Sequence, residues 1–208
     1  MEVLNSLGVL LGGSWASGVN LYLTIAGLGI LNRFGWINLP GNLDAISHPL
    51  IIIVAVLLYA VEFFADKIPL FDSVWDSIHT FIRPVGGAAL AYMAAADIGP
   101  VAQVPLALLS GSIAMDSHLT KATTRVAINT SPEPITNSVA SLTEDGLVIG
   151  VLWLIVNHPI IAGIAVILFI LFSIWFLKKM FRFLKRVFSF FARPKAEEQL
   201  NNTTNTKN

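Results

Sequence analysis

The chain has 208 residues, of which 55% are hydrophobic, 12% are charged and none is cysteine. Soluble domains carry about 25% charged residues, so half that share, together with apolar runs near bilayer length, predicts a membrane protein. The lack of cysteine excludes disulfides, thiolate metal ligands and cysteine nucleophiles. Seven of the thirteen Lys and Arg residues lie between Lys178 and Lys195, so the remainder of the chain is acidic.

The first apolar block covers residues 2–32. As a straight helix it would be about 45 Å long, against a hydrocarbon core of about 30 Å. Its middle, GGSWASG at residues 12–18, is rich in small residues. Either the helix is interrupted there, or the small residues let a neighbouring backbone approach closely.

Two further helices follow in the first half. One is predicted over residues 49–66 and carries Glu62 and Asp66 on one face, at i and i+4. The next begins amphipathic and continues with small residues to residue 98. A single polar stripe at i, i+4, i+7 and i+11 is formed there by Asp72, Asp76, His79 and Arg83.

The second half begins with another long block, residues 99–129, in which His118, Lys121 and Arg125 share one helical face. Ser131-Pro132-Glu133-Pro134 then favours a helix start, because Ser caps well and Pro suits the first position. Helices are predicted over residues 133–157 and 159–178, separated at His158-Pro159.

The fold class that we predict is an all-α polytopic membrane protein with about six transmembrane helices. Residues 11–23 match residues 109–121 at Leu, Gly, Ser, Ala and Leu. This echo suggests two inverted three-helix repeats, residues 2–98 and 99–178, whose first helices are interrupted at residues 12–18 and 110–116.

A basic, aromatic-rich juxtamembrane helix is predicted over residues 178–192, completing a membrane domain of residues 1–192, with a disordered cytoplasmic tail at 193–208. Cytoplasmic segments of membrane proteins are rich in Lys and Arg, so the basic segment after the last span is expected in the cytoplasm. With six spans, the N-terminus is expected on the same side. The expected partners of the basic segment 178–195 are the anionic lipids of the inner leaflet.

Ionisable residues at membrane depth are costly and usually face a pathway, a cavity or one another. The residues expected to line a substrate or ion pathway between the repeats are Asp76, His79, Asp116, His118, Lys121 and Arg125. The expected supporting charges are Glu62, Asp66, Asp72, Arg83 and Glu133. Asp76 and His79 would be the protonatable pair, and Lys121 and Arg125 anion contacts or charge partners.

The leading functional hypothesis is a small secondary transporter or channel for a small ion or anion. The alternative is a membrane scaffold in which the same charges form structural ion pairs. No enzyme, cofactor or metal site is expected, because the sequence contains no GxSxG elbow, Walker loop, dinucleotide fingerprint or HExxH motif. A homodimer through Gly-xxx-Gly faces is expected, and nucleic acid is not an expected partner.

The segment HLTKATTRVAINTSPEPITN at residues 118–137, taken with SGVNLYLTIAGLG and ADKIPLFDSVWDSIHTFIRP, resembles a bacterial inner-membrane family catalogued only as a domain of unknown function. The motif that carries the resemblance is His-xx-Lys-Ala-xx-Arg-xxx-Asn-x-Ser-Pro-Glu-Pro. It covers His118, Lys121, Ala122, Arg125, Asn129, Ser131, Pro132, Glu133 and Pro134, followed by Thr136 and Asn137. The resemblance implies an integral protein of the bacterial inner membrane and implies no activity.

Overall fold

The computed structural model describes the backbone of residues 2–129 and 134–205 and the side chains of residues 6–68, 70–129, 135–186 and 189. The described backbone is all-α, as predicted, and contains no strand. In chain order the elements are α1 (Glu2–Val19), α2 (Leu21–Arg33), the 3-10 helix η1 (Gly41–Ser47), α3 (Pro49–Ala65), α4 (Pro69–Ala94), the 3-10 helix η2 (Ala96–Ile98), α5 (Pro100–Asn129), α6 (Pro134–Asn157) and α7 (Pro159–Asn205). Each helix from α3 to α7 begins at a proline, whose missing N–H is harmless in a first turn.

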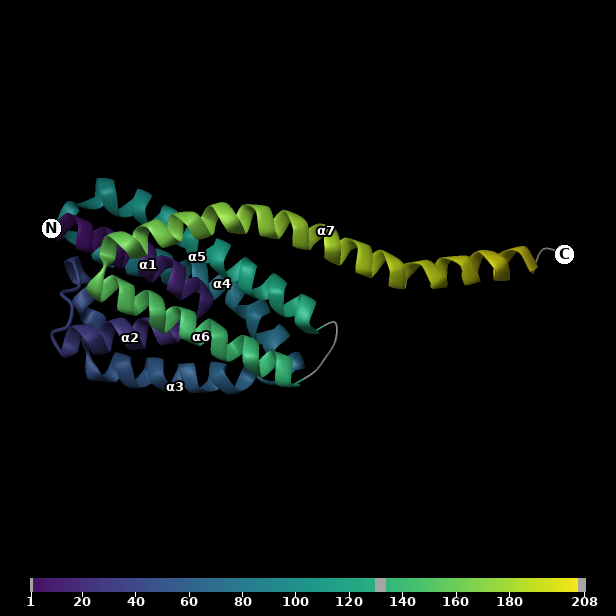
Figure 1. Cartoon of the computed structure of the whole chain (residues 1–208), viewed down its shortest axis with the longest axis horizontal. Helices are drawn as coiled ribbons and strands as arrows, with labels where there is room; N and C mark the ends of the chain where they lie inside the picture. The colour runs from purple at the N-terminus through teal and green to yellow at the C-terminus, as the bar shows by residue number, and fades with distance from the viewer. Residues whose placement is uncertain (1, 130–133, 206–208) are drawn as a thin grey trace.

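Helices α1 and α2 form a hairpin that enters the bundle and returns to the same end. The chain leaves helical geometry at Asn20, whose side chain accepts a hydrogen bond from the Leu23 N–H and so caps α2. Beyond this turn α2 runs back along α1, and Leu28 lies 3.6 Å from where a Cβ on Gly13 would be. Figure 1 shows both purple helices in the same half of the bundle.

The predicted interruptions at residues 12–18 and 110–116 are wrong. Helix α1 is continuous through the first segment, and α5 is continuous through the second. Their small residues serve close packing instead. The hydroxyls of Ser14 and Ser110 touch, and a Cβ on Gly18 would collide with the Ser117 hydroxyl and the Ala114 carbonyl. The first block is interrupted, but only at Asn20.

The contacts between α1 and α5 show that these helices run parallel. Ser14 meets Ser110, and Gly18, one turn later, meets Ala114, one turn further along α5. Equivalent helices of an inverted repeat would run antiparallel, so these segments do not form the predicted inverted pair.

The hairpin also changes where the two ends of the chain lie. Because α1 and α2 together return to their starting end, α1 begins at one end of the bundle and α7 extends beyond the other (Figure 1). Six spans with both termini on one side therefore do not agree with the structure. Helix α7 includes the predicted juxtamembrane segment, and its described backbone stays helical to Asn205, where the sequence predicted a disordered tail from residue 193.

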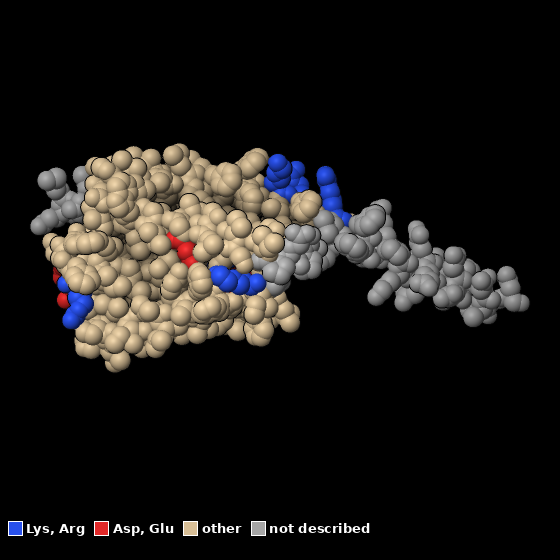
Figure 2. All heavy atoms as spheres, turned by 60° about the horizontal axis from the view of Figure 1, so that its bottom comes forward, with Lys and Arg blue, Asp and Glu red and all other residues tan. Residues whose placement is uncertain are grey.

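Two described helices are long and apolar enough to cross a membrane, Ile135–Asn157 and Pro159–Arg186. A third span results if η1 and α3, which bend by 69° at their junction, count as one. Large apolar side chains also cover the outer surface, with Val101 91% and Phe81 77% exposed. Charged side chains are sparse on the face shown in Figure 2. A surface of this kind indicates a membrane-associated protein.

The bundle has two halves with different interiors. We call the hairpin half the part formed by α1, α2 and η1 with the end of α4, the start of α5 and the end of α6. Its core is apolar and includes Val9, Leu28, Leu43, Leu90 and Leu152. We call the charged half the part formed by the end of α3, the start of α4, the end of α5 and the start of α6. The tip of the hairpin meets this second half.

Candidate functional site

Charged side chains fill the interior of the charged half. This charge cluster consists of Glu62, Asp66, Asp72, Asp76, Arg83, Lys121, Arg125, Glu144 and Asp145. All are buried except Glu144, whose side chain is 15% exposed. The polar stripe predicted on α4 is confirmed. Asp72, Asp76, His79 and Arg83 are all buried, whereas the other faces of this part of α4 carry exposed apolar residues.

Arg83 connects α4 to the end of α3 and to the hairpin tip. Its Nη2 lies 2.7 Å from Glu62 Oε1, and its Nη1 lies 3.5 Å from Asp76 Oδ1. Nη1 also donates a hydrogen bond of 3.2 Å to the carbonyl of Gly18. That carbonyl belongs to the last turn of α1, where helix geometry supplies no partner. Arg83 therefore compensates both a buried carboxylate and the negative end of α1.

Lys121 occupies a similar place on α5. Its Nζ lies 3.1 Å from Asp66 Oδ2, 3.4 Å from Glu62 Oε1 and 3.6 Å from Glu144 Oε2. It also donates to the carbonyl of Val19, at 3.4 Å. The two last carbonyls of α1 are thus both contacted by cations, one from α4 and one from α5.

Arg125 holds α5 against α6. Its Nε and Nη2 donate to the two carboxylate oxygens of Glu144 at 3.0 and 2.7 Å, a bidentate pair. Its Nη1 donates to the backbone carbonyl and the side-chain oxygen of Asn137, both at 2.9 Å. This guanidinium therefore fixes the start of α6 in position.

His118 supports Arg83 and stays neutral. Its Nδ1 lies 2.8 Å from Arg83 Nη1, and a guanidinium can only donate, so Nδ1 accepts and the ring proton is on Nε2. Nε2 then donates to the hydroxyl of Thr80 at 3.0 Å. A second proton, on Nδ1, would face the positively charged guanidinium of Arg83. The neutral ring instead accepts a hydrogen bond from Arg83 and so orients it.

Both ring nitrogens of His79 contact neutral groups. Its Nδ1 lies 2.8 Å from the carbonyl of Trp75 and must carry the ring proton. Its Nε2 accepts a hydrogen bond of 3.0 Å from the hydroxyl of Tyr22, at the hairpin tip. Protonation of Nε2 would only reverse that hydrogen bond.

The charge cluster contains more carboxylates than cations. With both histidines neutral, six carboxylates face three cationic side chains. The cations have their shortest ion pairs with Glu62, Asp66 and Glu144, at 2.7, 3.1 and 2.7 Å. Lys67 lies nearby, but its Nζ donates to the Phe63 carbonyl and stands over that ring, and it forms no ion pair within 4.0 Å with the described carboxylates.

Three carboxylates are therefore in surplus. Asp76 approaches a cation no closer than 3.5 Å, and Asp72 no closer than 3.9 Å. Asp145 has no ion pair among the described residues, but its two oxygens accept hydrogen bonds from Asn20 and Tyr59, at 3.1 and 3.0 Å. Asp145 is thus held by neutral donors, whereas Asp72 and Asp76 are not fully satisfied.

Buried carboxylate oxygens without a hydrogen-bond donor are concentrated here. Among the described residues they are Glu62 Oε2, Asp66 Oδ1, Asp72 Oδ1 and both oxygens of Asp76. Buried polar atoms are normally hydrogen-bonded, so five unpartnered acceptors in one cluster need an explanation. Asp76 is the extreme case, because its residue is 4% exposed and neither oxygen accepts a hydrogen bond.

The structure brings together five of the six predicted pathway residues and leaves one apart. Asp76, His79, His118, Lys121 and Arg125 lie in or against the charge cluster. Asp116 faces α7 instead, where it accepts a hydrogen bond of 2.6 Å from the Ser173 hydroxyl. Of the predicted supporting charges, Glu62, Asp66, Asp72 and Arg83 belong to the cluster, and Glu133 lies outside the described residues.

Several cluster contacts were not predicted as site residues, namely Asn20, Tyr22, Tyr59, Asn129, Asn137, Glu144 and Asp145. A sequence signal existed for α6, because Asn137, Ser141, Glu144 and Asp145 recur with helical spacing. No comparable signal marked Asn20 and Tyr22, whose role depends on the reversal of the chain between α1 and α2.

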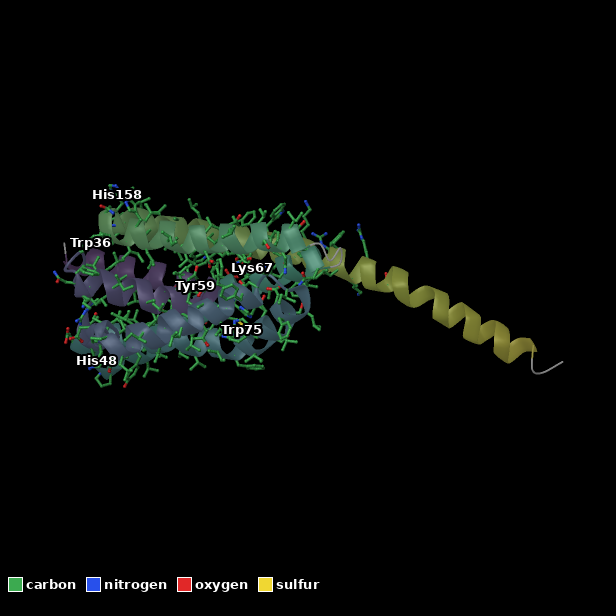
Figure 3. The ribbon with its side chains drawn as sticks, turned by 90° about the horizontal axis from the view of Figure 1, so that it is seen from below. Trp36, His48, Tyr59, Lys67, Trp75 and His158 are labelled. Atoms are coloured by element: carbon green, nitrogen blue, oxygen red, sulfur yellow. The ribbon has the colours of Figure 1, made fainter. Side chains whose placement is uncertain are left out.

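A groove of about 270 Å³ reaches the cluster from the side, between α1, α5, α6 and α7. Lys121 and Glu144 line it, together with Trp15, Leu147 and Phe169. Figure 3 shows Lys67 and Trp75 in the half from which α7 extends, and Trp36, His48 and His158 at the opposite end. The cluster is therefore reached near the end of the bundle that lies away from the start of α1.

An all-helical bundle with an apolar exterior and a charged interior defines the class of this molecule, a helical membrane-associated protein. Within that class, the family model for a domain of unknown function (DUF4126) matches residues 7–179, and the chain belongs to this family. The family resemblance stated from the sequence is thereby confirmed. No curated protein and no solved structure matches the chain.

Proposed function

We propose that this protein is a small secondary transporter or channel and that a positively charged ion binds in the charge cluster. The observation that carries the proposal is the surplus of three carboxylates over cations in a buried, membrane-associated interior. Unpaired buried charge is costly, and ionisable residues at membrane depth commonly mark ion pathways. A bound cation would compensate the surplus. An anion, which the sequence left open, would increase it.

The hairpin tip supports this proposal. Transporter sites are often built where a helix ends inside the membrane and its terminal carbonyls face the site. Here the carbonyls of Gly18 and Val19 end α1 inside the bundle, beside Arg83 and Lys121. Non-helical backbone at this depth is tolerated where protein or a polar cavity satisfies it.

We further propose an arrangement in the bacterial inner membrane. Helices α3 to α7 would cross the bilayer, and the α1–α2 hairpin would enter from one side and return. The basic residues of segment 178–192 would place the charged half toward the cytoplasm, against anionic lipids. A Cβ added to Gly146 or Gly150 would meet nothing within 4 Å, so these faces of α6 leave room for the predicted homodimer contact.

The alternative function is a membrane scaffold whose charges are structural. The short pairs of Arg83 with Glu62 and of Arg125 with Glu144, both 2.7 Å, favour it. It accounts for Glu62, Asp66 and Glu144 by ion pairs and for Asp145 by neutral donors, but it leaves Asp72 and Asp76 with cation contacts of 3.5 Å or longer.

Ion flux into proteoliposomes tests the two proposals. Liposomes containing the full chain would be challenged with gradients of H⁺, Na⁺, K⁺ and Cl⁻, and influx compared with protein-free liposomes. We expect cation influx that is lost in Asp76→Asn, which removes a surplus carboxylate, and kept in Asp116→Asn, a matched change outside the charge cluster. Absence of flux for every ion, from protein that remains folded, would favour the scaffold.

A further inference from the structure

We propose that the ion bound by the charge cluster is the proton and that Asp76, with Asp72 one turn before it on α4, holds it. This inference rests on the proposed ion-transport function and names its substrate. It starts from the unpartnered oxygens of Asp76, which is 4% exposed and points into the cluster.

A proton is the cation that this arrangement of atoms suits. The cluster has five buried acceptor oxygens without donors, and a proton on a carboxylate converts an acceptor into a donor. A metal ion requires several ligands that converge on one point. The described residues contain no group of three His, Asp or Glu side chains placed to hold a metal ion, because Arg83, Lys121 and Arg125 stand between the carboxylates.

Every helix packed around Asp76 supplies a titratable or charged group. The titratable and charged groups around it are Glu62 from α3, Asp66 directly after α3, Asp72, His79 and Arg83 from α4, His118, Lys121 and Arg125 from α5, Glu144 from α6 and Tyr22 from α2. Its nearest cations are already shared, since Arg83 has its shortest ion pair with Glu62 and Lys121 with Asp66. Asp76 is therefore the cluster carboxylate that can gain or lose a proton on either oxygen without breaking a hydrogen bond.

The protonatable groups of α4 form a line. Asp72, Asp76 and His79 are at i, i+4 and i+7 and span about 10 Å along the helix axis. The line starts in the first turn of α4, where Asn129 donates to Asp72 Oδ2 at 3.0 Å. It ends where His79 Nε2 meets the Tyr22 hydroxyl at the hairpin tip. His118 lies beside this line but cannot join it while Arg83 contacts its Nδ1.

Proton flux measured with a pH-sensitive dye in proteoliposomes, driven by a potassium diffusion potential, tests the inference. We expect acidification by the full chain, reduced to the level of protein-free liposomes by Asp76→Asn and by Asp72→Asn. Asp76→Glu, which keeps the carboxyl group, is expected to restore part of the flux. Asp116→Asn is the matched control, because that carboxylate faces Ser173 outside the cluster and its loss should leave the flux unchanged.

Each result distinguishes this inference from the function on which it rests. Flux of Na⁺ or K⁺ without acidification would overturn the proton as the bound ion and keep cation transport. Flux of Cl⁻ alone, or no flux of any ion, would overturn both proposals. Unchanged proton flux in both Asp76→Asn and Asp72→Asn would show that these carboxylates do not carry the proton and would overturn the inference. Asn imitates a protonated Asp, so Asp76→Asn should fold and melt no lower than the unmodified protein. Failure of this variant to fold would show a structural carboxylate and overturn the inference.

Discussion

The hairpin half and the charged half of the bundle share the long helices α4, α5 and α6, yet they bury opposite kinds of side chain. The first part of helix α4 buries Asp72, Asp76 and Arg83, whereas its last turns bury Leu90 and Ala91 against the hairpin. The hairpin half is packed through small residues and apolar contacts. The charged half retains unpartnered acceptors and surplus charge. The comparison suggests that one half fixes the fold while the other is suited to a change of protonation.

The largest expected effect comes from breaking a short ion pair in the charged half. Arg125→Met would leave Glu144, whose side chain is only 15% exposed, without its bidentate partner, and removing one partner of such a pair costs about 3 kcal/mol, the lower end of the range for fully buried pairs. The free energy of unfolding in detergent measures the loss. Arg33→Met, at the exposed end of α2, is the control and should cost less than about 1 kcal/mol. Equal losses would mean that the charged half does not depend on its ion pairs.

The next effect tests the close packing of the hairpin. A methyl group on Gly18 would meet the Ser117 hydroxyl and the Ala114 carbonyl, so α1 and α5 would have to separate. We expect Gly18→Ala to lower the free energy of unfolding by about 1–3 kcal/mol. The matched change Gly13→Ala in the same helix, whose Cβ would lie in ordinary contact 3.6 Å from Leu28, should instead stabilise α1 by about 0.5–1 kcal/mol. If both substitutions changed the free energy of unfolding in the same direction, the close packing of α1 on α5 at Gly18 would be contradicted.

The sequence predicted local features well and long-range geometry poorly, for a physical reason. The starts of α3 and α7 at Pro49 and Pro159 follow from proline chemistry, and the stripe on α4 follows from helical periodicity. The break at Asn20 lies inside a continuous apolar block that contains no proline and has glycines at several other positions, so neither the hairpin nor the number of crossings could be predicted from it. Asp116 was predicted to face the cluster but faces α7 instead. One helix can contact two neighbours, and only tertiary packing decides which of its residues faces which neighbour.

A smaller effect should come from the contact between the two halves. Tyr22→Phe removes the hydroxyl that donates to His79 Nε2 at 3.0 Å, leaving this nitrogen without a partner. The expected loss is about 1 kcal/mol of unfolding free energy. Tyr92→Phe, on the 46% exposed Tyr92, is the control and should have no measurable effect. If both changes are neutral, the hairpin tip is not held by this hydrogen bond.

The smallest effect is expected at Asp116, which shares residue type and helix with the site but not its surroundings. Asp116→Asn keeps an oxygen that can accept from the Ser173 hydroxyl, so the free energy of unfolding should change by no more than about 0.5 kcal/mol. Thermal unfolding of this variant beside Asp76→Asn compares a satisfied carboxylate with an unsatisfied one. If Asp116→Asn destabilises the protein more than Arg125→Met does, the principal charged site is the α5–α7 contact. Near-neutrality would leave the surplus charge of the cluster as the property that sets the charged half apart.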